Sequence, residues 1–142
     1  MPAPLTINDC MRRNPITISE TANLVQAIER IVENKITGLT VVDPQGQVAG
    51  VLSELDCIRA ILTSLYNDGD PEQSLVSEVM TAAVNTCKSS DGIIEVAQSM
   101  LDTRQRRRPV IEDGKLVGQV SSANILWALM EHSRRKVHGP KA

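Results

Sequence analysis

The sequence predicts an α+β fold in which two tandem β-α-β-β-α repeats pack sheet to sheet about a pseudo-twofold axis. The first observation behind this prediction is a duplication. Residues of the first half match residues 69 positions later. Beyond a one-residue deletion near Pro44, they match residues 68 positions later. The second is that the pattern Gly-x-x-Ser-x-x-Asp/Asn closes each copy, at residues 50–56 and 118–124. The third is that the spacing of apolar residues repeats together with these identities.

The first repeat is expected over residues 5–66. A proline precedes its first strand, and apolar residues at helical spacing indicate two amphipathic helices. A run rich in β-forming residues ends in Asp-Pro-Gln-Gly, which is a strong turn signal. The expected elements are a strand at 15–18, a helix at 24–32, strands at 39–42 and 48–52 around a turn at 43–46, and a helix at 55–65.

The second repeat, residues 75–131, follows the same order after a linker at 67–74 that is dense in turn-forming residues. A half of about 55 residues buries too little surface to be stable alone, so the copies are expected to pack sheet against sheet. Residues 132–142 form a basic tail that we expect to fray. The expected elements are a helix around 96–101, strands at 109–111 and 116–120 around a turn at 112–114, and a helix around 125–130.

The composition is that of an ordinary soluble globular protein, with 42% hydrophobic and 23% charged residues. A net charge of −2 gives no general attraction to nucleic acid or to anionic membranes. No apolar stretch approaches the roughly 20 residues that a membrane-spanning helix needs, and the N-terminus lacks the features of a signal peptide. We therefore expect a cytoplasmic protein without a membrane partner.

The residues that most enzymes and metal sites use are scarce. The two histidines, His132 and His138, lie in or beside the basic tail, which leaves the folded body without an imidazole general base. Cys10, Cys57 and Cys87 are odd in number and widely spaced, which argues against disulfides and a zinc site. We expect no catalytic residue, no metal and no enzymatic activity.

Ser53 and Asp56 admit two interpretations that are compatible with each other. Ser-x-x-Asp before an apolar helix is typical of a capping box, in which the serine hydroxyl and the carboxylate satisfy backbone N–H groups. A carboxylate in the same place can also accept hydrogen bonds from both hydroxyl groups of a ribose, and a helix N-terminus favours an anion. Taken by themselves, the residue types at these two positions favour the capping role over ribose binding.

The two hairpins at 41–46 and 109–114, each followed by a hydrophobic strand and the Gly-x-x-Ser-x-x-Asp/Asn pattern, resemble the CBS-domain family, named for cystathionine β-synthase. The resemblance covers residues 5–131. It implies a tandem pair, also called a Bateman module, that forms a homodimer and binds AMP, ADP or ATP, with S-adenosylmethionine ranked after them. Such a pair would regulate an unknown protein in trans. A ligand-free dimeric adaptor is the alternative.

The resemblance also implies two clefts that differ in their chemistry. In nucleotide-binding members, side chains two and three positions before the Pro-Val strand reach phosphates, and here these are Arg107 and Arg106. A solvated helix end accounts for Arg104 and Arg108 of the same arginine run. The residues expected at the first-ranked cleft are Val51, Leu52, Ser53, Asp56, Asn85, Gln105, Arg106 and Arg107.

The second cleft carries Asn124 where the first carries a carboxylate. An amide offers one carbonyl acceptor and an NH₂ donor, so it cannot bind a diol through two acceptors. Nucleotide binding there is expected to be weaker or absent. Contacts of the basic runs with nucleic acid are a minor alternative that we do not favour. The residues expected at this cleft are Ser121, Asn124, Ile16, Ile36, Thr37 and Gly38.

Overall fold

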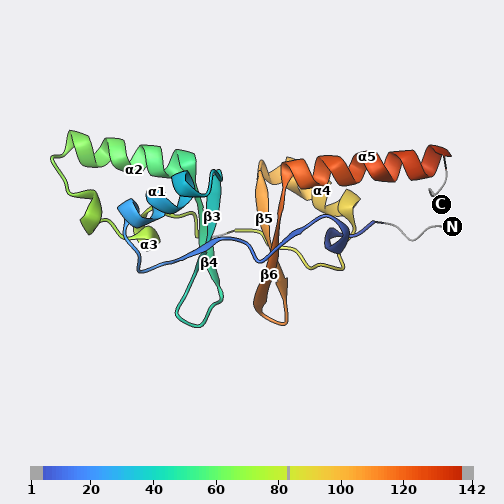
Figure 1. Ribbon diagram of the computed structural model, residues 1–142, viewed down its shortest axis with the longest axis horizontal. Helices are drawn as coiled ribbons and strands as arrows, with labels where there is room; N and C mark the ends of the chain where they lie inside the picture. The colour runs from blue at the N-terminus through green and yellow to red at the C-terminus, as the bar shows by residue number, and fades with distance from the viewer. Residues whose placement is uncertain (1–4, 83, 139–142) are drawn as a thin grey trace. The chain divides into compact units, whose positions relative to one another are not determined.

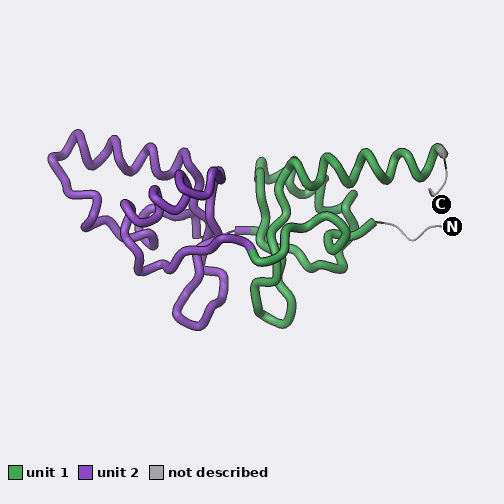
Figure 2. The backbone as a smooth tube through the Cα atoms, in the orientation of Figure 1, with its two compact units in different colours: residues 1–14, 85–142 green, residues 15–84 purple. Residues whose placement is uncertain are grey.

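The computed structural model describes residues 5–82 and 84–138, and the chain divides into two compact units (Figure 2). Unit 2 is the continuous stretch Pro15–Val84, whereas unit 1 joins the segment up to Asn14 to the residues from Asn85 onward. Each unit contains a three-stranded sheet and packed helices (Figure 1). The α+β class predicted from the repeat is confirmed.

Unit 2 has the strand order β2-β3-β4, with a parallel β2–β3 pair and an antiparallel β3–β4 hairpin. The hairpin turn follows from its sequence: Asp43 Oδ1 accepts hydrogen bonds from the N–H groups of Gln45 and Gln47, and Gly46 supplies a φ of +80°. The elements are β2 (Thr17–Ser19), α1 (Leu24–Glu33), β3 (Gly38–Val42), β4 (Val48–Ser53), α2 (Glu54–Tyr66), the 3₁₀ helix η2 (Pro71–Gln73) and α3 (Val76–Val79).

Unit 1 has the strand order β1-β6-β5, and both strand pairs are antiparallel. Its hairpin turn uses positive φ angles at Asp113 and Gly114. The elements are the 3₁₀ helix η1 (Ile7–Asp9), β1 (Arg12–Arg13), α4 (Ile93–Thr103), β5 (Arg107–Glu112), β6 (Lys115–Ser121) and α5 (Ser122–His138).

Each unit has its own hydrophobic core, formed where one face of its sheet meets its helices. In unit 2 the alternate strand residues Leu39 and Val41 lie in the core together with Leu24 of α1. In unit 1 Val110 and Val120 lie in the core with Ile93 of α4. The stripes of apolar residues that predicted these helices therefore face sheets, as amphipathic helices do.

The start of the first repeat, up to Asn14, packs in unit 1 rather than with the strands that follow it. Arg12 is the register partner of Gln119 in β6, and the N–H of Ile7 donates to the carbonyl of Asp91. Conversely, the segment around Thr81, which precedes the second hairpin, packs in unit 2. There the backbone groups of Thr81 and Val51 hydrogen-bond to each other at 2.9 and 3.0 Å. We call these two stretches the exchanged segments.

The exchanged segments explain the repeated glycine of the Gly-x-x-Ser pattern. A Cβ atom on Gly50 would lie 2.5 Å from the carbonyl oxygen of Thr81, and one on Gly118 would lie 2.9 Å from that of Arg12. Methionines one residue earlier, Met80 and Met11, approach the same two glycines. Only glycine permits this close approach of a backbone, so the duplicated Met and Gly belong to one packing motif.

The last helix is longer than the sequence suggested. α5 continues to His138, so the residues at which we expected a frayed tail to begin are helical, and residues 139–142 of that tail lie outside the described part. The linker at 67–74 belongs to unit 2 and contains η2. Among the helices of the described residues, none is both long and apolar enough to cross a membrane.

Candidate ligand-binding site

Both copies of Gly-x-x-Ser-x-x-Asp/Asn fold into the same capping box. In unit 2 the N–H of Asp56 donates to Ser53 Oγ at 3.1 Å, and the N–H of Ser53 donates to Asp56 Oδ2 at 2.9 Å. In unit 1 the N–H of Asn124 donates to Ser121 Oγ at 3.2 Å, and the N–H of Ser121 donates to Asn124 Oδ1 at 2.9 Å. The capping role is therefore present in both repeats.

The two boxes differ in the side-chain atom that the box itself does not use. At Asp56 this atom is Oδ1, a hydrogen-bond acceptor, which lies 3.6 Å from Nη1 of Arg59. At Asn124 it is the NH₂ group, which is a donor. The side chain of Asp56 is 15% exposed and that of Arg59 is 77% exposed, so the guanidinium can move away while the carboxylate stays in place.

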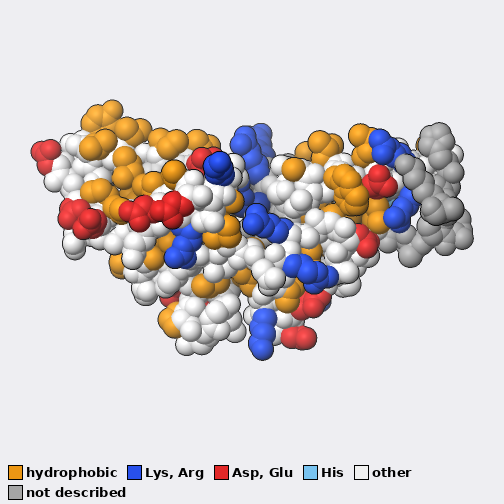
Figure 3. Space-filling view, viewed as in Figure 1, with side chains coloured by type: hydrophobic (Ala, Val, Ile, Leu, Met, Phe, Trp, Pro, Cys, Tyr) orange, Lys and Arg blue, Asp and Glu red, His pale blue; other side chains and the backbone are white. Residues whose placement is uncertain are grey.

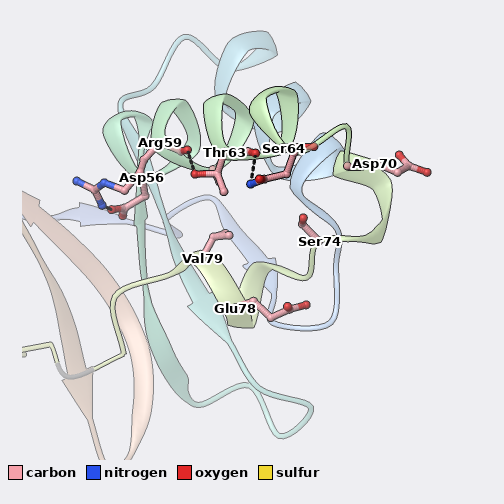
Figure 4. Close-up of a pocket in the computed structure, with 11 residues that line it drawn as sticks. Asp56, Arg59, Thr63, Ser64, Asp70, Ser74, Glu78 and Val79 are labelled. Carbon is pink, nitrogen blue, oxygen red and sulfur yellow. Dashed lines mark hydrogen bonds and ion pairs between the residues drawn. The ribbon is translucent and has the colours of Figure 1, made fainter.

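A pocket of about 480 Å³ lies beside Asp56, within unit 2 (Figure 4). Asp56 and Arg59 lie at one end of it, α2 forms one wall, and the segment from Ser74 to Val79 forms the other (Figure 4). Asp70 lines the rim with its carboxylate directed away (Figure 4). This pocket was not predicted from the sequence, although its α2 lining residues 56, 60 and 63 follow helical spacing.

Four of the predicted residues are neighbours in unit 2, at the start of α2: Thr37, Gly38, Ser53 and Asp56. Gly38 and Ser53 are register partners across the β3–β4 hairpin, and the carbonyl of Thr37 accepts the N–H of Glu54 at 3.0 Å. Leu52, by contrast, has its side chain fully buried in the core, so only its backbone can reach a ligand. The remaining predicted residues of this unit, Val51, Ile16 and Ile36, are half-buried.

In unit 1 a hydrogen-bonded chain joins two of the predicted residues. Gln105 Nε2 donates to the carbonyl of Asn85 at 3.1 Å, and Gln105 Oε1 accepts from Arg108 Nε at 2.9 Å. Arg108 Nη2 reaches Thr103 Oγ1 at 3.4 Å. Both ends of the Gln105 amide are therefore occupied within the unit.

The position of Arg108 corrects our expectation of a solvated helix end. Arg104 fits that expectation, because it is exposed and caps α4 with a φ of +54°. Arg108 is only 4% exposed and occupies the place that Leu39 holds in the first repeat. Strand alternation directs Arg108 to the same side of β5 as Val110, which faces the core. Its hydrogen bonds to Gln105 and Thr103 compensate in part for the buried charge.

Arg106 and Arg107 lie at the start of β5, next to the second capping box. Arg106 is exposed, Arg107 is half-buried, and the carbonyl of Arg106 accepts the N–H of Ser122 at 2.8 Å. Arg107 and Ser121 are register partners. Asp56 belongs to unit 2 and this arginine pair to unit 1, so their cooperation at one ligand stays a prediction.

The thiol beside Asp56 is not a reactive group. Cys57 is buried, and desolvation, together with the nearby carboxylate of Asp56, raises the pKa of its thiol to about 11. Burial also raises the pKa of Cys87 to about 11, although Arg108 opposes the change. All three cysteines are free, and no group of three potential metal-ligating side chains occurs in residues 5–82 and 84–138.

The chain belongs to the CBS domain family, whose model matches residues 7–63 and 76–131. The two matched stretches correspond to the two repeats, and together they cover most of the chain. The resemblance inferred from the hairpins and the Gly-x-x-Ser-x-x-Asp/Asn patterns is therefore confirmed.

Curated relatives include CBSX2, a chloroplastic CBS domain-containing protein of Arabidopsis thaliana, which is 28% identical over 155 residues. The match covers 91% of this chain and 65% of CBSX2. The protein MJ1225 of Methanocaldococcus jannaschii is 28% identical over 123 residues, covering 87% of this chain and 42% of the relative. The chain thus spans between 42% and 65% of the length of these two relatives.

Solved structures of CBS pairs have the same fold. A crystal structure of CBSX2 in complex with AMP is 29% identical, has a TM-score of 0.77, and covers 92% of this chain and 99% of its own. The CBS domain pair of protein MJ0100, in complex with 5′-methylthioadenosine and S-adenosyl-L-methionine, is 22% identical with a TM-score of 0.79. The match covers 91% of this chain and 98% of the MJ0100 chain, and at this identity it supports the fold alone.

Proposed function

We propose that the protein is a regulatory module without enzymatic activity, which binds an adenine nucleotide at a site built on Asp56 and controls a separate partner protein. The observation that carries the proposal is the geometry of this carboxylate. The capping box fixes Asp56 through Ser53 and leaves Oδ1 as an acceptor beside a pocket. The pocket volume, about 480 Å³, falls within the roughly 300 to 1,000 Å³ of small-molecule sites.

A ribose diol suits a carboxylate better than it suits an amide. Each carboxylate oxygen has two lone pairs, so Asp56 can accept from a hydroxyl group even through the oxygen that its capping box uses. Asn124 has only one acceptor oxygen, which its capping box already uses toward Ser121, and it carries an NH₂ donor where Asp56 carries a second oxygen. We therefore propose one principal site per chain, at Asp56.

The class of ligand is inferred from a relative and from charge. CBSX2, with 29% identity over nearly the whole chain, has been crystallised in complex with AMP. Arg106 and Arg107 offer two guanidinium groups of the kind that binds phosphate. AMP, ADP or ATP are the proposed ligands, and S-adenosylmethionine ranks below them because it has no phosphate.

We further propose that the module acts as a cytoplasmic homodimer. In support, α2 exposes the large apolar side chains of Ile58, Leu62 and Leu65. Hydrophobic side chains gather along this helix in Figure 3. Exposed apolar surface of this extent is typical of interaction sites. The same observation favours the second candidate function, that of a dimeric adaptor without a ligand.

A thermal-shift panel with AMP, ADP, ATP, S-adenosylmethionine and adenosine distinguishes these two functions. A ligand at about 100 times its Kd stabilises the folded state by about 2.7 kcal/mol. If no compound raises Tm, the adaptor function is supported instead. Replacing Arg106 and Arg107 together by alanine should weaken ADP and ATP more than adenosine, and an equal loss for adenosine would contradict the phosphate role.

A further inference from the structure

The edge strand β1 of the unit 1 sheet consists of Arg12 and Arg13 and pairs with β6. The register partners of these arginines are Gln119 and Gly118. Directly opposite residues of an antiparallel pair share one face of a sheet, and neighbours along a strand alternate between its faces. Gly118 also pairs with Val110, which lies in the core. Arg12 therefore shares with Gln119 the face opposite the core, which we call the outer face, whereas Arg13 lies on the other face.

A second arginine lies on the outer face of this sheet. Arg108 is buried on the core side of β5, so its neighbour Arg107 is directed to the outer face. The register partner of Arg107 is Ser121, two residues beyond Gln119 on β6. Because β6 lies between β1 and β5, two strand spacings, about 10 Å, separate the two arginines across the sheet. The outer face thus carries two guanidinium groups with an amide and a hydroxyl group between them.

The equivalent face of the unit 2 sheet carries no charge at these positions. The duplication relates Arg12 to Thr81 and Arg107 to Gly38. The strand pairing is the same in both units, because Thr81 pairs with Val51 of β4 in the way that Arg12 pairs with β6. The fold therefore supplies two equivalent faces, and the two guanidinium groups occur on only one of them.

The charge of the whole of unit 1 favours an anion on its outer face. Unit 1 carries seven acidic and twelve basic side chains, for a net charge of +5, whereas unit 2 carries ten acidic and three basic ones, for −7. Basic side chains lie over the strands of unit 1 in Figure 3. Arginine binds phosphate through paired N–H donors, and a positive local field strengthens that attraction. Phosphate is therefore the ligand chemistry that fits the outer face.

We infer that Arg12 and Arg107 hold a phosphate chain on the outer face of unit 1, and that Arg12 makes binding depend on the number of phosphates. The inference rests on the proposed function for the nucleoside part of the ligand, but not for its anionic part. The separation of the two arginines exceeds the size of one phosphate group. A chain of two or three phosphates therefore contacts both guanidinium groups better than a single phosphate does, which favours ADP and ATP over AMP.

Calorimetric titration of Arg12→Ala with AMP and ATP tests this role. Arg13→Ala is the matched control, because it removes the same charge from the same strand, but its guanidinium lies on the other face and donates to Asn8 Oδ1. Arg12→Ala should lower the affinity for ATP at least about threefold and leave the affinity for AMP within about 1.5-fold. Arg13→Ala should leave both affinities within about 1.5-fold of those of the unmodified chain. An ATP affinity that Arg12→Ala leaves unchanged, or that both variants lower equally, would overturn the inference.

Titration with inorganic tripolyphosphate separates a failure of this inference from a failure of the proposed function. Tripolyphosphate carries the phosphate chain without the nucleoside, so its binding does not depend on Asp56. If no nucleotide binds to the unmodified chain, the proposed function fails and tripolyphosphate decides the inference. Weaker binding of tripolyphosphate to Arg12→Ala than to Arg13→Ala then supports it. Equal binding to the two variants, or no binding to the unmodified chain, then overturns it.

Discussion

Replacing Gly50 by alanine tests the packing of the exchanged segments. The new Cβ would lie 2.5 Å from the carbonyl oxygen of Thr81 and 2.9 Å from Sδ of Met80. The oxygen belongs to a backbone that is paired with Val51, so relief requires this pairing to shift. Overpacking costs about 1 to 3 kcal/mol, and a weakened hydrogen bond adds about 1 kcal/mol. We expect the free energy of unfolding to fall by about 2 to 4 kcal/mol.

Urea unfolding followed by far-UV circular dichroism measures this change. Gly69→Ala is the matched control in the same unit, because the nearest atom to its Cβ would be the rotatable hydroxyl of Ser64, at 3.2 Å, and the backbone of Ser64 stays at an ordinary contact distance of 3.5 Å or more. We expect this control to stay within about 1 kcal/mol of the unmodified chain. If Gly50→Ala were no less stable than Gly69→Ala, the account of the exchanged segments would be wrong.

Three further predictions concern stability, each measured by urea unfolding. Ser53→Ala removes the cap of α2 and should cost about 1 kcal/mol, whereas no loss would contradict the capping box. Gln105→Ala leaves the guanidinium of Arg108 without its nearest acceptor and should lower the free energy of unfolding by about 1 to 3 kcal/mol. Arg108→Leu, which installs the residue of the first repeat, should lower it less. The raised pKa values of Cys57 and Cys87 mean that the unfolded chain loses these protons first, so stability should fall from pH 9 toward pH 11 and be unchanged below pH 8.

Local patterns sufficed to predict most of the secondary structure. The hairpin turns need positive φ at Gly46 and Gly114, and glycine at these places is a signal visible in the sequence. The capping boxes at Asp56 and Asn124 follow from residues three positions apart. Such features depend on neighbours along the chain, so the sequence alone contains the information that they require.

Features that depend on distant residues could not be predicted in the same way. The pairing of Arg12 with Gln119 joins positions far apart in the chain, and nothing local distinguishes this short strand from a loop. Arg108 was misplaced because its buried position depends on partners that the fold supplies. The repeated Met11 and Gly118 were visible as identities, but their contact became apparent only in the structure.

The central claim is that the oxygen left over by the Asp56 capping box determines nucleotide binding. Asn124 shows that an amide preserves this box, so Asp56→Asn exchanges one acceptor for a donor without removing the cap. Calorimetric titration with the nucleotide that most raises Tm should give one site for the unmodified chain. It should show at least a tenfold loss of affinity for Asp56→Asn, and a second site for Asn124→Asp. Unchanged affinity in a fully folded Asp56→Asn variant would contradict the account.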